Sequence, residues 1–563
     1  MEAKRLSFRD AAAWLSEIIG PDAAYIRLGV AYTIAISLLS LATPISVQLL
    51  INSVAFTALP APLWTLSGVL LLLLLVVAGL SALRVYVMAL FERRVFARVV
   101  AEITLRAVHA QNPFFSDANR GDLFNRYFDL VVVQKSVPSL VIGACTIALQ
   151  GTVGLVLTSF YHPFFLAFNA VLLLALLCVW LVWQRGAITG AVALSHAKHA
   201  AARWLESVGG SNGFYKSSRH LGFAMDRSEQ MTAAYVGAHR RYFRYSFAQT
   251  LAFLLIYAFA SAALLALGGN LILRGELSIG QLVAAELILS GVFYGVSQLG
   301  WYLDTFYDLV ASSEELSLLF AIPQEQAVTS GQGPNDGTVR LRDVRLEEVV
   351  FDFELRGGEQ LVVAAEPGAE HPLTMLLKRH VTPNRGLVSI GEVDLGALDM
   401  YLLRSAVTVL NRPTIVEVTI REYLSLATPD AAASAMLDVL DIVGLGERVA
   451  TLPAGLDTAL ASSGWPLSIG EVMELKLANA LLSRPRVLVL SPLFDMMRVD
   501  RLQRALEALR SEGTTVLLCT GRPEAITLDG WFWLGRRDQR RFASATELQA
   551  HAARREVRNA EQA

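Results

Sequence analysis

Six long apolar runs in the first half of the chain constrain its fold more than any other feature. Each run is long enough to cross a hydrocarbon layer of roughly 30 Å, so the pattern predicts six transmembrane helices. The composition agrees, because 54% of the residues are hydrophobic and the mean hydropathy is +0.46. The runs lie near residues 26–52, 62–91, 137–160, 162–185, 245–269 and 278–303.

Lys and Arg are distributed unevenly among the connections between these runs. The connections after the second and fourth runs each carry several Lys and Arg, whereas the other three hold only Arg274. By the positive-inside rule, both termini and the two long connections are expected in the cytoplasm. The N-terminus has Lys4, Arg5 and Arg9 but lacks a signal-peptide cleavage site, so we expect the first run to remain in the mature protein.

The two long connections have helical periodicity and are broken by turns. In residues 91–110 the apolar positions recur at three and four, which predicts a helix that continues beyond the bilayer as a stalk. Asn, Pro and Gly interrupt the first stalk within residues 112–130 and Gly interrupts the second within 206–219, so each tip is predicted to be a turn with a short helix. The charges alone would fit a plain solvated helical hairpin equally well.

The character of the chain changes after the sixth run. Residues 1–320 are assigned to the membrane domain, and residues 321–338, rich in Gly, Gln, Pro and Asp, to a linker. Residues 339–563 alternate short β-branched runs with helical stretches, which predicts an α/β domain with a mainly parallel sheet. The net charge of -2 gives no indication of a nucleic-acid partner. The three widely spaced cysteines suggest neither a disulfide framework nor a metal site.

The stretch "LVVAAEPGAEHPLTMLLKRH", residues 361–380, has the layout of a phosphate-binding loop without its chemistry. An apolar strand, a loop with Gly368 and an apolar helical run follow in order, but the expected lysine and most of the glycines are missing. The stretch is either a nucleotide site that has been lost or a loop that never bound a nucleotide.

The arrangement of the whole chain resembles a half-transporter of the ABC exporter family. "PFFSDANRGDLFNR", Pro113 to Arg126, is similar to the first coupling helix of such exporters. "LPAGLDTALASSGWPLSIGEVMELKLANALLSRPRVLVL", Leu452 to Leu490, matches the stretch from the family's signature to its Walker B strand without a gap. The resemblance implies a type I exporter fold: six spans with cytoplasmic extensions, followed by a P-loop-type ABC domain. It also implies export across a bacterial inner membrane.

In the frame of this family the Walker A motif, G-x-x-G-x-G-K-[ST], is degenerate. Its glycine positions hold Ala365, Gly368 and Glu370, its lysine position holds His371, and its hydroxyl position holds Pro372. A carboxylate beside a triphosphate costs roughly 4 kcal/mol at 4 Å with an effective dielectric constant of 20. Proline cannot ligate Mg²⁺, although it fits the first turn of a helix. The fold of the loop is therefore expected to persist without the site, as a Walker A remnant.

The other nucleotide motifs are degenerate in the same frame. The Walker B strand ends in Ser491-Pro492 where Asp-Glu would hold Mg²⁺ and polarise water. Asn411 stands at the Q-loop glutamine, Gly521 at the H-loop histidine, and Arg498 near the D-loop aspartate. The chain is therefore expected to bind no cofactor through its own Walker motifs and to have no ATPase activity alone.

The signature motif retains more of the family's residues than the other nucleotide motifs do. "LSIGE", Leu467, Ser468, Ile469, Gly470 and Glu471, retains the serine and second glycine of LSGGQ at the start of a predicted helix. In ABC dimers the signature of one subunit completes the ATP site of the other, so Mg-ATP is expected at a site shared with a partner. Alternatively, Ser468 is only an N-cap.

Substrate contacts are predicted in the sixth run, where Glu286, Ser290, Ser297 and Trp301 recur at helical spacing. Two functional hypotheses follow. In the first, the chain is the catalytically degenerate subunit of a heterodimeric exporter, whose partner half-transporter has intact Walker motifs. In the second, it is an ATP-independent pseudo-transporter that acts as a membrane scaffold or regulatory subunit. The retained signature and the coupling elements at 114–126 and 209–219 favour the first, and the exported substrate is not identified.

Overall fold

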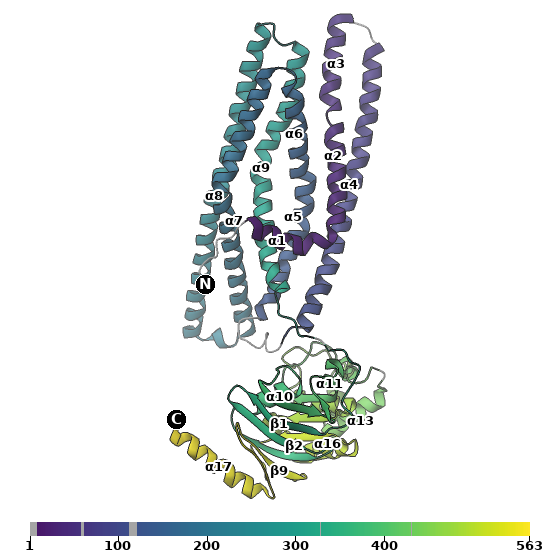
Figure 1. The fold of residues 1–563 in the computed structure, drawn as a ribbon, viewed down its shortest axis with the longest axis vertical. Helices are drawn as coiled ribbons and strands as arrows, with labels where there is room; N and C mark the ends of the chain where they lie inside the picture. Colours follow the sequence, from purple (N-terminus) through teal and green to yellow (C-terminus); the bar gives the residue numbers. More distant parts are fainter. Residues whose placement is uncertain (1–7, 58–60, 112–120, 327, 430, 563) are drawn as a thin grey trace. The chain divides into compact units, whose positions relative to one another are not determined.

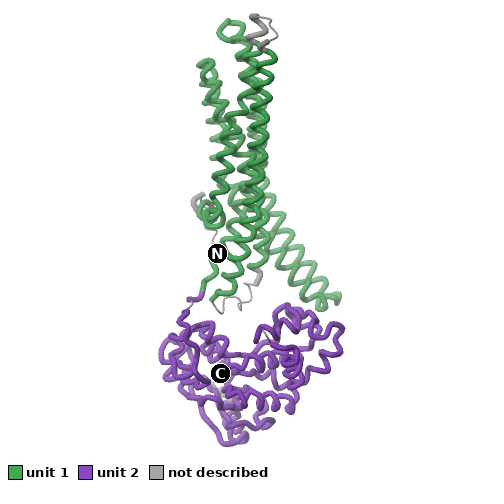
Figure 2. Tube along the Cα trace, turned by 90° about the vertical axis from the view of Figure 1, so that its right-hand side faces the viewer, with its two compact units in different colours: residues 1–324 green, residues 325–563 purple. Residues whose placement is uncertain are grey.

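The computed structural model describes the chain except for residues 1–7, 58–60, 112–120, 327, 430 and 563. It divides into two compact units, residues 1–324 and 325–563 (Figure 2). The boundary between the units falls within the stretch 321–338 that the sequence assigns to a linker.

Unit 1 is built from long helices, with α1 running crosswise to the others (Figure 1). The described residues contain six helical segments long and apolar enough to cross a membrane, and each overlaps one predicted run, so this prediction is confirmed. The elements of the unit are α1 (Phe8–Ile19), η1 (Gly20–Asp22), α2 (Ala23–Leu39), α3 (Ala42–Thr57), α4 (Ala61–Val108), η3 (Gly121–Phe128), α5 (Asp129–Ser139), η4 (Leu140–Ala144), α6 (Cys145–Ser159), α7 (Pro163–Gly210), η5 (Phe214–Lys216), α8 (Ser218–Leu273) and α9 (Ile279–Phe320).

Several of these helices are much longer than a bilayer is thick. Helix α4 has 48 residues and, at 1.5 Å per residue, is about 72 Å long, more than twice the hydrocarbon thickness of about 30 Å. The same holds for α7, α8 and α9, whose ends are set by local caps. Ser278 caps α9 in a capping box with Gln281, and Pro163 occupies the first turn of α7. The helices therefore continue past the apolar runs as stalks.

Two interruptions in unit 1 follow from particular residues. The first apolar run breaks between Leu39 and Ala42, and Pro44 lies in the first turn of α3. In "GVFYG" on α9, a Cβ on Gly295 would lie 2.5 Å from Ile147, whereas one on Gly291 would meet nothing within 4 Å. Close helix packing is thus the role of Gly295 alone.

Unit 2 contains two sheets of different kinds. In the first, β1 (Val339–Leu346) lies between β2 (Val349–Leu355) and β4 (Arg385–Ile390), all antiparallel, with β5 (Val393–Asp394) at the edge. In the second the order is β10-β9-β3-β8-β7-β6, parallel throughout except for the antiparallel edge strand β10. Its strands are β3 (Gln360–Ala365), β6 (Val407–Leu410), β7 (Val487–Leu490), β8 (Thr515–Cys519), β9 (Gly530–Leu534) and β10 (Gln539–Phe542).

The central strands of the parallel sheet are buried on both faces. Every residue of β7 and β8 is buried, as is typical of parallel sheets covered on both sides. This confirms the predicted α/β domain. The helices of the unit are α10 (Glu370–Leu377), α11 (Met400–Ala406), α12 (Ile420–Ser425), α13 (Ala433–Val443), α14 (Gly446–Thr451), α15 (Ile469–Ser483), α16 (Val499–Ser511) and α17 (Ala545–Gln562), with the 3₁₀ turns η6 (Gly455–Asp457) and η7 (Pro492–Met496).

Part of the predicted linker is held against unit 2. Asp399 and Met400 donate backbone hydrogen bonds to the carbonyls of Gln332 and Val328, at 2.8 and 3.0 Å. Arg404 binds both carboxylate oxygens of Glu325, at 2.7 and 3.0 Å. Backbone pairing and this two-point ion pair therefore fix residues that composition alone assigns to a flexible connection.

Candidate functional site

Four loops follow the carboxyl ends of parallel strands and meet at one edge of the second sheet. They begin after β3, β8, β7 and β6, which are neighbours in that order. Because parallel strands end at the same edge, residues far apart in sequence converge there. A cavity of about 540 Å³, called here the strand-end cavity, is lined by Gly368, Glu370, His371, Asn411, Ser491, Pro492 and Leu493.

The loop between β3 and α10 is held by the hairpin that follows β9. The backbone N–H of Arg536 donates to Glu366 Oε2 at 2.8 Å, and its Nε donates to the carbonyl of Pro367 at 2.9 Å. Gly368 has φ +89°, and a Cβ there would lie 2.9 Å from the guanidinium of Arg536. This glycine is required by backbone conformation and close approach. Ala365, the first glycine position of the frame, is the last residue of β3.

Helix α10 begins at Glu370, so residues 370–372 form its first turn. Pro372 is tolerated there because backbone N–H groups of a first turn have no partner within the helix. His371 is exposed and Glu370 is half-buried. The strand–loop–helix layout thus forms although the phosphate-binding side chains are absent.

The strand-end cavity lacks, among the described residues that line it, the Lys and Arg side chains that would bind a nucleoside triphosphate. Burial raises the pKa of the Glu370 carboxyl. Burial, followed by the nearby carboxylates of Glu370 and Asp495, raises the pKa of the Cys519 thiol well above its usual value. Glu370 therefore stands where a phosphate-binding loop would offer positive charge.

The end of β7 turns directly into a short 3₁₀ helix. Ser491 is 4% exposed; its N–H donates to the carbonyl of Leu410 at 3.1 Å, and its hydroxyl accepts from the N–H of Leu493 at 3.4 Å. The hydroxyl thus caps η7, and Pro492 occupies its first position. Neither residue supplies a carboxylate for Mg²⁺ or for an attacking water.

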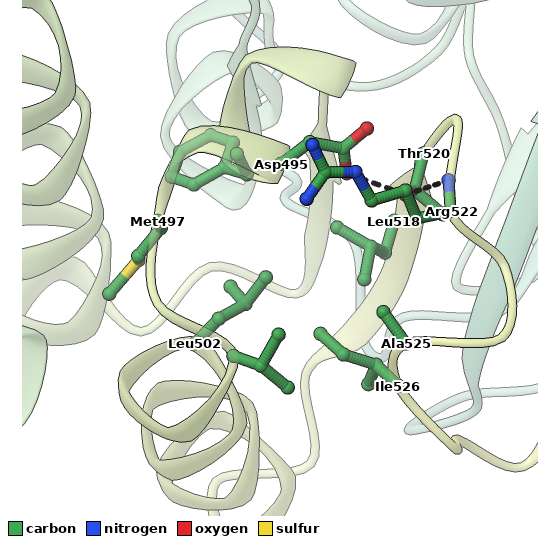
Figure 3. Close-up of a pocket in the computed structure, with 10 residues that line it drawn as sticks. Asp495, Met497, Leu502, Leu518, Thr520, Arg522, Ala525 and Ile526 are labelled. Carbon is green, nitrogen blue, oxygen red and sulfur yellow. Dashed lines mark hydrogen bonds between the residues drawn. The ribbon is translucent and has the colours of Figure 1, made fainter.

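Asp495 is a site residue that the sequence analysis missed. Its carboxylate accepts from the hydroxyl of Thr520 at 2.5 Å and from the N–H of Gly521, at the H-loop position, at 2.9 Å. Its one sequence signal is its place as the only acidic residue between β7 and α16. Figure 3 shows Asp495 beside Thr520 and Arg522 at the rim of a mainly apolar cavity of about 50 Å³, far smaller than a nucleotide needs.

Arg498, near the D-loop aspartate position, does not line the strand-end cavity. It is exposed and pairs with Asp500 two residues on, at 3.0 Å. Because both side chains are largely exposed, the pair contributes little to stability.

The signature residues begin α15 and remain accessible. The hydroxyl of Ser468 accepts from the N–H of Glu471 at 3.3 Å, and the Glu471 carboxylate accepts from the N–H of Ser468 at 2.8 Å, completing a capping box. Glu471 also pairs with Arg448 at 3.1 Å. Leu467 is buried, whereas Ile469 is 54% exposed, and a Cβ on Gly470 would meet nothing within 4 Å.

The predicted coupling elements are described in part. Residues 114–120 lie outside the described residues, and the remainder of the first element forms η3. Arg126 on η3 forms an ion pair with Glu315 of α9, and His196 of α7 bonds Glu314 at 2.9 Å. In the second element, 209–219, α7 ends at Gly210, η5 follows, and α8 begins at Ser218.

The predicted pathway residues share one outward face of α9. Glu286 and Ser290 are exposed, and the hydroxyl of Ser290 donates to Glu286 Oε1 at 3.2 Å. Trp301 is 57% exposed and Ser297 is partly buried. Tyr294, which sequence reasoning did not select, is 65% exposed one turn beyond Ser290.

Comparisons with known proteins show which proteins this chain is similar to. No family model matches the chain. It is 25% identical over 274 residues to the uncharacterized ABC transporter ATP-binding protein YknU of Bacillus subtilis (strain 168), which covers 46% of each protein. It is 26% identical over 234 residues to the leukotoxin export ATP-binding protein LtxB of Aggregatibacter actinomycetemcomitans, covering 40% of this chain and 33% of that one. The match to the leukotoxin translocation ATP-binding protein LktB of Mannheimia haemolytica is 25% over 269 residues, covering 46% and 38%. The aligned region thus spans less than half the length of these curated relatives.

A solved structure of a bacterial Atm1-family ABC exporter with ATP bound is similar in fold to most of the chain. The TM-score is 0.77 at 17% sequence identity, and the match covers 95% of this chain and 97% of that one. At this identity the likeness concerns the fold.

Proposed function

We propose that this chain, which has the fold of an ABC exporter half-transporter, is a catalytically degenerate subunit of an ABC exporter in a bacterial inner membrane. In this proposal it supplies half of the translocation pathway and donates its signature helix to the ATP site of a partner half-transporter with intact Walker motifs. Unit 2 and both termini lie in the cytoplasm. The names of the sequence relatives describe ATP-binding proteins, one of leukotoxin export and one of leukotoxin translocation; the loss of catalysis in this proposal rests on the residues of this chain.

The observation that carries the proposal is the chemistry of the strand-end cavity. Glu370, His371 and Pro372 stand at its helix, and Ser491 and Pro492 stand at the end of β7. Phosphoryl transfer needs groups that neutralise phosphate, hold Mg²⁺ and orient water, and these side chains supply none of them. The Asp495 carboxylate accepts from Thr520 on one oxygen and from the backbone of Gly521 on the other.

The signature helix supports a role in a shared site. Ser468 is exposed at the N-terminus of α15, where the helix dipole and free N–H groups favour an anion. Its neighbour Gly470 leaves open space above the helix. Ser468 and Gly470 would therefore contact a partner's bound ATP as the serine and the second glycine of LSGGQ do.

The alternative function is an ATP-independent pseudo-transporter, a scaffold or regulatory subunit. The capping box favours it, because it gives Ser468 a structural reason to be present. A neighbouring gene for an exporter half with complete Walker motifs would favour the heterodimer.

The test has two parts. Labelled Mg-ATP binding is first measured on the purified chain, and ATP hydrolysis is then measured with the partner for the unchanged chain and for Ser468→Ala. Ser544→Ala is the matched control, because the Ser544 hydroxyl accepts from the N–H of Glu547 with the same 3.3 Å geometry at the start of α17. We expect no binding by the chain alone and a loss of hydrolysis only with Ser468→Ala. Tight binding by the isolated chain would contradict the degenerate site, and hydrolysis indifferent to Ser468 would favour the scaffold.

A further inference from the structure

Arg84 is a charged side chain enclosed among the helices of unit 1. It lies on α4 between Leu83 and Val85, which are 49% and 55% exposed, yet is itself only 7% exposed. Val87 and Met88, three and four residues on, are buried on the same side of the helix. Arg84 therefore points into the bundle.

The hydrogen-bond partners of Arg84 are neutral. Its Nη1 donates to the hydroxyl of Thr33 on α2 at 3.2 Å and to that of Thr146 on α6 at 2.8 Å. Each hydroxyl donates its own proton to a carbonyl one turn back, Gly29 or Ile142. Both threonines are thus oriented as acceptors toward the guanidinium, but no carboxylate of the described residues pairs with it.

Two buried polar atoms near this arrangement have no hydrogen-bond partner within the described part of the chain. One is Nε of Arg84 and the other is the hydroxyl of Ser37. Ser37 is 1% exposed and follows Thr33 by one helical turn on the same face of α2. A buried donor left unpaired is costly, and an uncompensated charge more so.

The packing closes the site on the side of the stalks. A Cβ on Gly29 would lie 2.7 Å from the side chain of Met88 and 3.2 Å from Val141, so α2, α4 and η4 are in close contact there. The π-helical turn η4 begins one residue before Val141, whose carbonyl lies 3.4 Å from the hydroxyl of Thr33. Such turns widen a helix locally and often mark functional positions.

The charge pattern of α4 indicates the depth of Arg84 in a bilayer. Residues 61–83 carry no charge and, at 1.5 Å per residue, span about 34 Å, the full hydrocarbon thickness of about 30 Å. If this uncharged stretch fills the hydrocarbon layer, Arg84 lies where that layer ends, on the side that leads to the stalk. With the orientation proposed above, this is the headgroup level of the cytoplasmic leaflet.

We propose that Arg84, oriented by the hydroxyl groups of Thr33 and Thr146, binds the phosphate of a phospholipid drawn from this leaflet together with the hydroxyl of Ser37. The phosphate supplies the missing negative charge and acceptors for Nε and the Ser37 hydroxyl, and its level in the bilayer matches that of the guanidinium. A soluble anion has the same chemistry, but it would have to enter the bilayer edge without acyl chains. The site is independent of nucleotide chemistry and of any partner subunit.

The experiment measures lipid binding to the purified full chain in an uncharged detergent by native mass spectrometry. Phosphatidylglycerol is compared with diacylglycerol of the same acyl chains, which lacks the phosphate. We expect the chain to prefer phosphatidylglycerol, and Arg84→Met to weaken its binding by about tenfold or more, as for the loss of a charge-assisted hydrogen bond. Arg93→Met, which removes an exposed charge from the same helix, is the matched control and should leave binding unchanged.

Further variants keep the test valid if Arg84→Met does not fold. Ser37→Ala, which leaves the charge in place, should weaken phosphatidylglycerol binding severalfold. Arg84→Lys should retain part of the preference for phosphatidylglycerol over diacylglycerol. Equal binding of the two lipids by the unchanged chain, or equal phosphatidylglycerol binding with and without Arg84, would overturn the proposal. If inorganic phosphate raises the melting temperature through Arg84 while phosphatidylglycerol binding does not depend on this residue, the lipid source is wrong and the site belongs to a soluble anion.

Discussion

Ser468 is placed to serve both as a helix cap and as a phosphate ligand, and replacing it with Asp separates the two roles. Its hydroxyl accepts from the N–H of Glu471 at 3.3 Å. Asp caps a helix about as well as Ser, whereas Ala costs about 1 kcal/mol. We therefore expect Ser468→Asp to unfold at the same temperature as the unchanged chain, and Ser468→Ala to unfold at a lower one.

At a shared ATP site we expect the opposite order, with Ser468→Asp more harmful than Ser468→Ala. A carboxylate 4 Å from a phosphate charge costs roughly 4 kcal/mol at an effective dielectric constant of 20, which corresponds to about a thousandfold in binding. Ile469 and Gly470 leave the N-terminus of α15 accessible to a partner, so little else screens this repulsion. Ser468→Asp should then abolish hydrolysis that Ser468→Ala reduces less.

The assay is ATP hydrolysis by the chain reconstituted with its partner in lipid nanodiscs, together with thermal unfolding of each variant. Ser544→Asp is the control for adding a charge at a capped helix start, since Glu547 donates to Ser544 at 3.3 Å. If Ser468→Asp retains unchanged hydrolysis while Ser468→Ala only lowers stability, Ser468 is a cap alone. The donated signature would then be refuted.

Three further predictions concern unit 2. Burial, then the charges of Arg404 and Lys378, lowers the pKa of His380 to about 4. The contribution of neutral His380 to stability is therefore complete above about pH 6.5 and is lost as pH falls toward 4. Pulse proteolysis should show the free energy of unfolding falling by roughly 2 kcal/mol between pH 7 and 5, and this fall should be absent in His380→Gln. Gly368→Ala should destabilise the unit by about 1–2 kcal/mol in the same assay, because φ is +89° and the guanidinium of Arg536 is 2.9 Å from the new Cβ; an unchanged stability would contradict this. The triple change Glu370→Gly, His371→Lys, Pro372→Thr should give measurable Mg-ATP binding without hydrolysis, since Ser491 and Pro492, directly after β7, supply no carboxylate, and hydrolysis by that variant would show that another residue activates water.

Several features of this protein were predictable because they depend on local sequence. Six apolar runs longer than the hydrocarbon layer leave few structures other than membrane-spanning helices, since each backbone polar group must be satisfied within its own segment. The break before Pro44 and the capped start of α15 at Ser468 likewise follow from the side chains present. The missing side chains of the phosphate-binding loop were also visible, because an absent lysine needs no structure to be noticed.

Other features were decided only by strand pairing and helix packing. Asn411, Ser491 and Glu370 line one cavity because β6, β7 and β3 end at the same edge of a sheet, an order that the sequence does not state. Asp495 reaches the N–H of Gly521 for the same reason.

The environments of individual charged side chains are likewise determined by the tertiary structure. Arg536 is brought onto the loop at Gly368 by the pairing of β9 with β3, and Arg84 appeared in sequence only as a charge inside an apolar run. Its enclosure by Thr33 and Thr146 arises from three helices meeting around it. Periodicity shows which face of a helix is apolar, but the partner of a buried charge is set by contacts between residues that the chain separates by tens of positions.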